Sequence, residues 1–225
     1  MKAKKLYILP LLALLSSCVS SIPLRSDISE FIASFSLEKS LSTYVNAGYS
    51  RHKVVFANNT KTEEFIEVDF NIENVNHPTY SYEHKTYKDD VLESTVNRNL
   101  VYKNEKIYYA SEEGEVEYSL ADCRKLINTY FYTQISMDGL YHSGAWYYGD
   151  FLTEMARELQ NFITINSDKT QLIFERNRTG TENGFNTTTS VKYNVNTLGM
   201  MEKYNESWTV EDGRYLTDEI VIFKN

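Results

Sequence analysis

The sequence contains few of the residue patterns that identify an enzyme or a disulfide-rich domain. Only two of its 225 residues are cysteine, so no framework of disulfides can hold the fold together. Its four histidines have no histidine or carboxylate partner at the helical spacing that zinc hydrolases use. The sequence also lacks a calcium loop, a phosphate-binding loop and the glycine pattern of dinucleotide-binding proteins. These absences predict a chain without a metal, a cofactor or a catalytic residue.

One histidine and one serine are adjacent, at His142 and Ser143, and they are the best candidates for a hydrolase site. Adjacency in sequence does not bring an imidazole against its neighbour's hydroxyl group, however. The Gly-x-Ser-x-Gly turn that exposes a serine nucleophile is also missing. We therefore predict that the protein is not an enzyme.

The first 17 residues have the organisation of a secretory signal peptide. Three lysines lie within the first five residues, an apolar run follows over residues 6–15, and Ser16 and Ser17 come next. The apolar run is shorter than the roughly 20 residues that a membrane-spanning helix needs. We predict a cleaved signal peptide over residues 1–17.

The segment Leu15-Ser16-Ser17-Cys18 resembles the lipobox of bacterial lipoproteins. The resemblance implies that Cys18 receives a diacylglyceryl group, that cleavage occurs just before it, and that the new amino terminus is acylated. Stable anchoring requires two or more acyl chains, which this modification supplies. The resemblance places the protein in the cell envelope, on the extracytoplasmic face of a bacterial membrane. The alternative is an ordinary signal peptide in which Cys18 is incidental.

The rest of the chain has the size and charge of one soluble domain. We predict a lipidated tether over residues 18–25 and a single domain over residues 26–225. The formal net charge of −8 disfavours nucleic acid as a partner, because nucleic-acid-binding surfaces are basic. Cys123 lies in an apolar helical stretch, where a buried thiol is the expected role.

Helical periodicity occurs at the start and in the middle of this domain. Ser26 or Asp27 is a candidate cap for a helix whose apolar stripe begins at Ile28 and continues to Val45, with a break at Ser36. Two further helices are predicted over residues 120–131 and 150–162.

Alternation with a period of two predicts strands over most of the remaining chain. Ile66, Val68, Phe70 and Ile72 alternate with polar residues, which is typical of a half-buried strand. Further strands are predicted around residues 80–84, 91–102, 106–110, 116–118, 171–176, 188–195, 200–210 and 215–223. Short turns between them indicate an antiparallel meander. The expected class is α+β, with a curved antiparallel sheet, an incomplete barrel, packed on the N-terminal and central helices.

This order of elements behind a lipobox resembles the lipoprotein-carrier half-barrel family, the LolA-like and LppX-like folds. The resemblance implies an incomplete barrel that can enclose an apolar cavity for acyl chains, but it carries over no binding residue. Eighteen tyrosines and eleven phenylalanines fit either an aromatic-lined cavity or ordinary strand composition.

The clearest candidate contact site is a loop that contains Tyr141, Trp146, Tyr147 and Tyr148, because its aromatic residues lie outside the periodic elements. Two functions are therefore expected. In the first, the domain binds a lipid or another apolar ligand without catalysis. In the second, it is a surface module that binds a protein partner through this loop.

Overall fold

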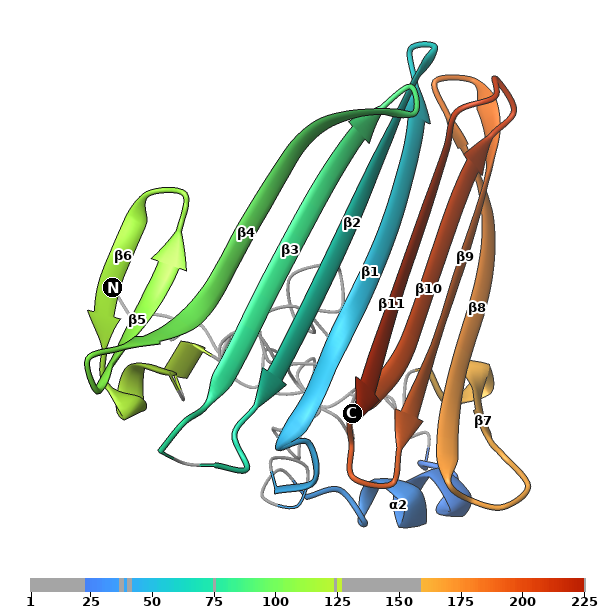
Figure 1. The fold of residues 1–225 in the computed structure, drawn as a ribbon. Coiled ribbons are helices and arrows are strands. Elements are labelled where there is room, and N and C mark those ends of the chain that lie inside the picture. Colours follow the sequence, from blue (N-terminus) through green and yellow to red (C-terminus); the bar gives the residue numbers. More distant parts are fainter. Residues whose placement is uncertain are drawn as a thin grey trace, which may run out of the picture.

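The described part of the chain is built around one large antiparallel sheet. The computed structural model describes residues 23–36, 39, 42–74, 76–123, 125–126 and 159–224. Within these residues, eleven strands form a single sheet (Figure 1). The strands of the first half are β1 (Asn46–Ala57), β2 (Thr60–Asn71), β3 (Thr79–Lys88), β4 (Val91–Lys103), β5 (Lys106–Ser111) and β6 (Gly114–Tyr118). Those of the second half are β7 (Ile163–Ile165), β8 (Gln171–Glu182), β9 (Phe185–Asn196), β10 (Met201–Val210) and β11 (Tyr215–Lys224).

The two halves of the sheet meet in its middle. The strand order is β6-β5-β4-β3-β2-β1-β11-β10-β9-β8-β7, and the paired strands run antiparallel. The chain thus starts at the centre, meanders to the β6 edge, resumes at the β7 edge and returns to the centre at β11 (Figure 1). The predicted antiparallel meander is confirmed.

The predicted α+β class, with the sheet packed on N-terminal and central helices, is wrong. The described residues form a mainly β structure, a single antiparallel sheet of long strands. The described residues also include two short helical elements, α2 (Ser26–Ile32) and η2 (Gln160–Phe162). Several strands are 10–13 residues long, about twice the common length of five or six. The predicted strands 91–102, 200–210 and 215–223 agree with β4, β10 and β11, whereas β8 and β9 extend beyond the predicted segments 171–176 and 188–195.

The N-terminal helix begins differently from the prediction and ends before the predicted break at Ser36, beyond which residues 39, 42 and 43 are also helical. Helix α2 ends at Ile32, and its N-cap is Arg25 rather than Ser26 or Asp27. The Arg25 guanidinium pairs with the Asp27 carboxylate, and its Nη1 atom also donates to the carbonyl oxygens of Gln160 and Ile163. These bonds hold the start of α2 against the start of β7.

The central helices fall mostly outside the described residues. Residues 120–123 and 125–126 are helical, and the end of the second predicted helix corresponds to η2. Cys123 is fully buried there, as predicted, and burial raises the pKa of its thiol.

Two-residue turns connect several of the long strands. Both turn residues have positive φ at Asn58-Asn59, Asp89-Asp90, Asn104-Glu105 and Asn183-Gly184. This is the backbone of a type I′ turn, whose twist matches that of the flanking strands. Asn and Asp tolerate the left-handed conformation better than most residues, which explains why they occupy these positions.

The two faces of the sheet differ in burial. On the buried face, Tyr49, Val68, Tyr204 and Ile220 are each at most 3% exposed. On the exposed face, alternate residues of the same strands are polar and accessible, such as Ser50 and Glu67. Helix α2 adds Ile28 and Phe31 to the buried core. The sheet therefore has one apolar side and one wet side, as alternation along the strands requires.

Candidate functional site

The predicted site residues lie outside the part of the chain that the structure describes. They are the lipidation residue Cys18, the recognition-loop residues Tyr141, Trp146, Tyr147 and Tyr148, and the hydrolase candidates His142 and Ser143. The site is therefore sought on the two faces of the described sheet.

A row of mostly apolar side chains crosses the buried face. Residues directly opposite one another on antiparallel strands share a face, so the strand register identifies the row. From β7 to β4 it consists of Ile163, Phe174, Tyr193, Tyr204, Ile220, Arg51, Ile66, His84 and Val96. Rings of Phe174 and Tyr193 stack with centroids 4.6 Å apart. We call these residues the apolar row.

The next row of the same face, toward the Asn58-Asn59 turn, is mostly polar. It consists of Arg176, Val191, Glu206, Asp218, Lys53, Glu64, Thr86 and Ser94. We call these residues the polar row. Seven of the nine residues of the apolar row are hydrophobic or tyrosine, against one of eight in the polar row. The buried face thus changes character between two consecutive rows.

A buried ion pair joins the two rows at the centre of the sheet. The Arg51 guanidinium donates to both carboxylate oxygens of Asp218, from Nε at 2.9 Å and from Nη2 at 2.6 Å. The two side chains are only 9% and 4% exposed. Because Arg51 belongs to β1 and Asp218 to β11, the pair also connects the two halves of the sheet. Bidentate geometry of this kind is the strongest form of the arginine–carboxylate contact.

Two rows that differ in this way suit an amphiphilic ligand better than a purely apolar or purely polar one. An acyl chain would lie against the apolar row, and a polar group would reach the ionic side chains beyond it. Apolar contact would supply most of the binding energy, and the polar row would fix the orientation of the ligand.

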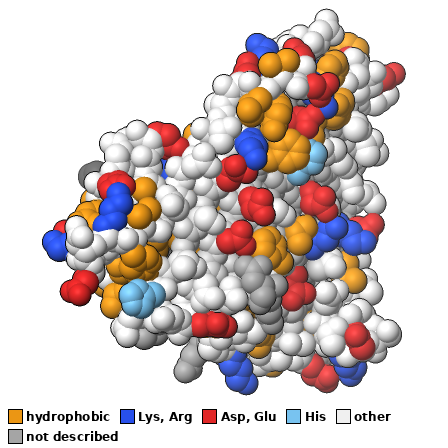
Figure 2. Space-filling model, in the orientation of Figure 1, with side chains coloured by type: hydrophobic (Ala, Val, Ile, Leu, Met, Phe, Trp, Pro, Cys, Tyr) orange, Lys and Arg blue, Asp and Glu red, His pale blue; other side chains and the backbone are white. Residues whose placement is uncertain are grey.

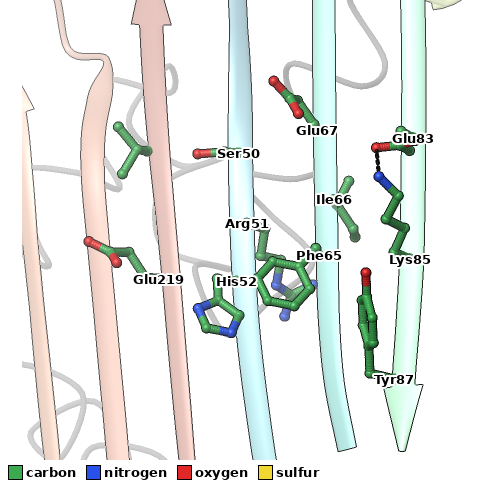
Figure 3. Close-up of a pocket in the computed structure, with 11 residues that line it drawn as sticks. Ser50, Arg51, His52, Phe65, Ile66, Glu67, Glu83, Lys85, Tyr87 and Glu219 are labelled. Atoms are coloured by element: carbon green, nitrogen blue, oxygen red, sulfur yellow. Dashed lines mark hydrogen bonds and ion pairs between the residues drawn. The ribbon is translucent and has the colours of Figure 1, made fainter. Parts of the chain in front are cut away.

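The exposed face carries a separate groove, which crosses β11, β1, β2 and β3. Its volume is about 440 Å³, and it is lined by residues that include Ser50, His52, Phe65, Glu67 and Glu219 (Figure 3). Ser50 is the smallest of these side chains and lies between larger neighbours. We call this feature the exposed-face groove.

Three ring side chains from neighbouring strands form one wall of the exposed-face groove. The His52 and Phe65 rings stack with centroids 4.2 Å apart and an interplanar angle of 12°. Tyr87 meets Phe65 edge to face, with centroids 5.6 Å apart. Figure 2 shows a cluster of hydrophobic side chains with a histidine beside it on this face, and acidic side chains below the cluster.

Ion pairs surround this aromatic wall. The Lys61 ammonium beside Glu63 holds the pKa of that carboxyl below its usual range, and His52 contributes to the same effect from 3.4 Å. The Glu83 carboxylate, 2.6 Å from Lys85, raises the pKa of that ammonium. The groove is therefore bordered by charges of both signs.

Neither a metal centre nor a membrane-spanning helix is found in the described ranges. Among those residues, no group of three or more histidine, cysteine, aspartate or glutamate side chains is placed to hold a metal ion. Within the same ranges, no helix combines the length and apolar character needed to cross a bilayer.

Comparison with known proteins leaves the family open. No protein-family model matches the sequence, and no curated protein is significantly similar to it. A solved structure from Brucella abortus, described as a beta-barrel-like protein of a domain of unknown function, DUF1849, aligns with 80% of this chain and 98% of its own. The identity is 6% and the TM-score 0.25, values too low to transfer a function.

Of the residues in these two features, Ile66 was predicted to lie in a half-buried strand, but none was predicted to belong to a site. Arg51 and Asp218 are 167 positions apart, and only the pairing of β1 with β11 brings them together. One local signal was present, since Arg51-His52-Lys53 places three basic or titratable residues inside an otherwise β-forming stretch. Such a break in alternation marks a strand whose two faces both carry polar groups.

Proposed function

We propose that this chain is a lipid-anchored protein of the bacterial cell envelope whose domain binds fatty acyl chains or a similar apolar ligand, without catalysis. The ligand is proposed from one observation, the change from apolar to polar side chains between the apolar row and the polar row of the buried face. The anchor rests on the sequence, in which the segment before Cys18 resembles a lipobox. A mainly β sheet of this kind is compatible with a binding domain that is not an enzyme.

The size of the apolar row supports a ligand of acyl-chain length. The row crosses nine strands, and neighbouring strands lie about 4.8 Å apart, so its full width exceeds that of an extended fatty acid. Further buried side chains continue the apolar surface toward α2, including Val68, Leu172, Val195 and Ile222. A ligand along the part of the row from β8 to β11 would contact Phe174, Tyr193, Tyr204 and Ile220.

Ligand binding is tested with a chain that begins at Val19. Chloroform–methanol extraction should release an acyl lipid, which mass spectrometry identifies. The fluorescent fatty acid 11-dansylaminoundecanoic acid should bind saturably and be displaced by oleate.

Ile66→Trp places a larger ring in the apolar row and should weaken dansyl binding by about tenfold or more. Phe65→Trp is the matched control, because the adjacent residue faces the opposite side, and it should leave the affinity unchanged.

Circular dichroism first establishes that Ile66→Trp is folded. If it is not, Val191→Trp makes the same test in the polar row, where the side chain is only half-buried. An extract without lipid, together with no saturable dansyl binding to the wild-type chain, would rule out the ligand-binding proposal.

The anchor is tested separately in the full chain expressed in a bacterium. Growth with radiolabelled palmitate should label the wild-type protein, and Cys18→Ser should abolish the label and release the protein from the membrane fraction. Cys123→Ser is the control, and its label should persist. Equal labelling of wild type and Cys18→Ser would refute lipidation at this residue.

A further inference from the structure

The exposed-face groove has a feature that solubility does not explain. Phe65 lies on β2, near the middle of the sheet, and its side chain is 39% exposed. Its ring neighbours are His52 and Tyr87, and charged side chains such as Glu67 line the same groove. Large aromatic side chains held in a rigid position on a wet surface are typical of recognition sites.

His52 and Tyr87 hold the Phe65 ring in place. Stacking against His52 from β1 and an edge contact with Tyr87 from β3 restrain its orientation. In Figure 3 the three rings project from three neighbouring strands toward the same region. A ring fixed in this way binds with little loss of conformational entropy.

Carboxylates line the groove next to this ring. Glu67 lies directly opposite Glu83 across the β2–β3 pair, and like charges in that position repel each other. Glu83 is paired with Lys85 at 2.6 Å, and the same ammonium also interacts electrostatically with the Glu67 carboxylate. Glu219 approaches from β11 and lines the same groove. A cation placed beside Glu67 would relieve the repulsion.

The spacing between the Phe65 ring and the Glu67 carboxylate indicates the kind of ligand. Phe65 and Glu67 are two residues apart on one strand and face the same side, so their Cα atoms are about 6.8 Å apart. An arginine side chain spans this distance, with its methylene groups or guanidinium plane on the ring and its charge at the carboxylate.

We infer that the exposed-face groove binds a basic peptide segment, with an arginine side chain laid over Phe65 and its guanidinium held by Glu67. Charge complementarity with a chain of net charge −8 favours such a partner. The site is on the opposite face from the apolar row, so this inference does not depend on the proposed ligand.

Titration with two blocked peptides tests the inference, using the chain that begins at Val19. Acetyl-Ser-Arg-Ser-Arg-Ser amide should shift the NMR signals of Phe65 and His52 saturably. The same peptide with citrulline in place of arginine keeps the shape without the charge, and it should bind at least about tenfold more weakly.

Three variants assign the binding to the groove. Glu67→Gln and Phe65→Ala should each weaken the arginine peptide by about fivefold or more. Glu115→Gln, an exposed carboxylate on the edge strand β6, should leave the affinity unchanged and so controls for net charge.

Four outcomes would overturn the inference. They are no saturable shift with the arginine peptide, equal binding of the citrulline peptide, full affinity in Glu67→Gln, and shifts at Phe65 that depend on protein concentration alone. The last would assign the groove to contact between copies of this chain. Ile66→Trp should bind the arginine peptide normally, so failure of lipid binding and failure of peptide binding are distinguishable.

Discussion

Replacement of Arg51 by alanine is expected to lower the free energy of unfolding by about 3–5 kcal/mol, the usual cost of leaving one partner of a buried ion pair behind. The reason is that Asp218, which is 4% exposed, would lose both hydrogen bonds from the guanidinium. Urea unfolding followed by tryptophan fluorescence measures the loss. Because most domains are stable by only 5–15 kcal/mol, the variant should unfold at a much lower urea concentration.

Two comparisons separate the effect of burial from the effect of charge. Arg51→Met combined with Asp218→Leu removes both charges and should recover most of the lost stability, because no buried carboxylate remains. Lys106→Ala breaks the ion pair between Lys106 and Glu117, two side chains that are each 54% exposed, and should leave the urea midpoint nearly unchanged. A loss below 1 kcal/mol for Arg51→Ala would contradict the assigned role of the pair.

Replacement of Gly48 by alanine is expected to lower the free energy of unfolding by roughly 1–3 kcal/mol, because the added methyl group has no space. A Cβ atom there would lie 2.2 Å from the carbonyl oxygen of Val68 and 2.8 Å from Cζ of Phe223. The first contact is with the backbone of β2, which cannot rotate away, so β1 and β2 would have to separate locally. Thermal unfolding by circular dichroism measures the change.

Gly180 supplies the matched comparison for this substitution. Gly180 also lies within a strand, β8. A Cβ atom added there would lie 3.3 Å from Oγ1 of Thr187, which is the end of a side chain that can rotate away. Gly180→Ala should be neutral or slightly stabilising, because glycine within a strand is entropically costly. Equal melting temperatures for Gly48→Ala and wild type would show that the strands move apart without cost.

Several strands could be predicted closely, since the expected segments 91–102, 200–210 and 215–223 correspond to β4, β10 and β11. The alternation that begins at Ile66 coincides with the second half of β2, which ends at Asn71. Strand β1 was harder to recognise, since Arg51 places a charged side chain on the buried face. Strand β7 is only three residues long, which is too short for any periodicity. Asp89-Asp90 is a turn in which both residues have a positive φ.

The candidate sites could not be predicted because they depend on pairing between distant segments. The apolar row requires the register of nine strands, and a shift of one residue in any of them would turn its side chains to the other face. The exposed-face groove requires the pairing of four strands, β11, β1, β2 and β3, whose side chains line it together. Local patterns identify which residues of a strand are apolar, but they do not identify which residue of the next strand lies beside them.

The pairing of the first strand with the last has a consequence for how the chain acquires its structure. Strands β1–β6 can form consecutive hairpins as soon as they are available, and so can β7–β11, because each of these contacts is local. The β1–β11 ladder is different, since it joins segments about 170 residues apart and cannot form until the end of the chain has arrived. Until then β1 presents an open edge, a known template for aggregation. The chain is therefore most prone to aggregation after β1 has been synthesised and before β11 has. Strand β11 completes the middle of the sheet rather than one of its edges.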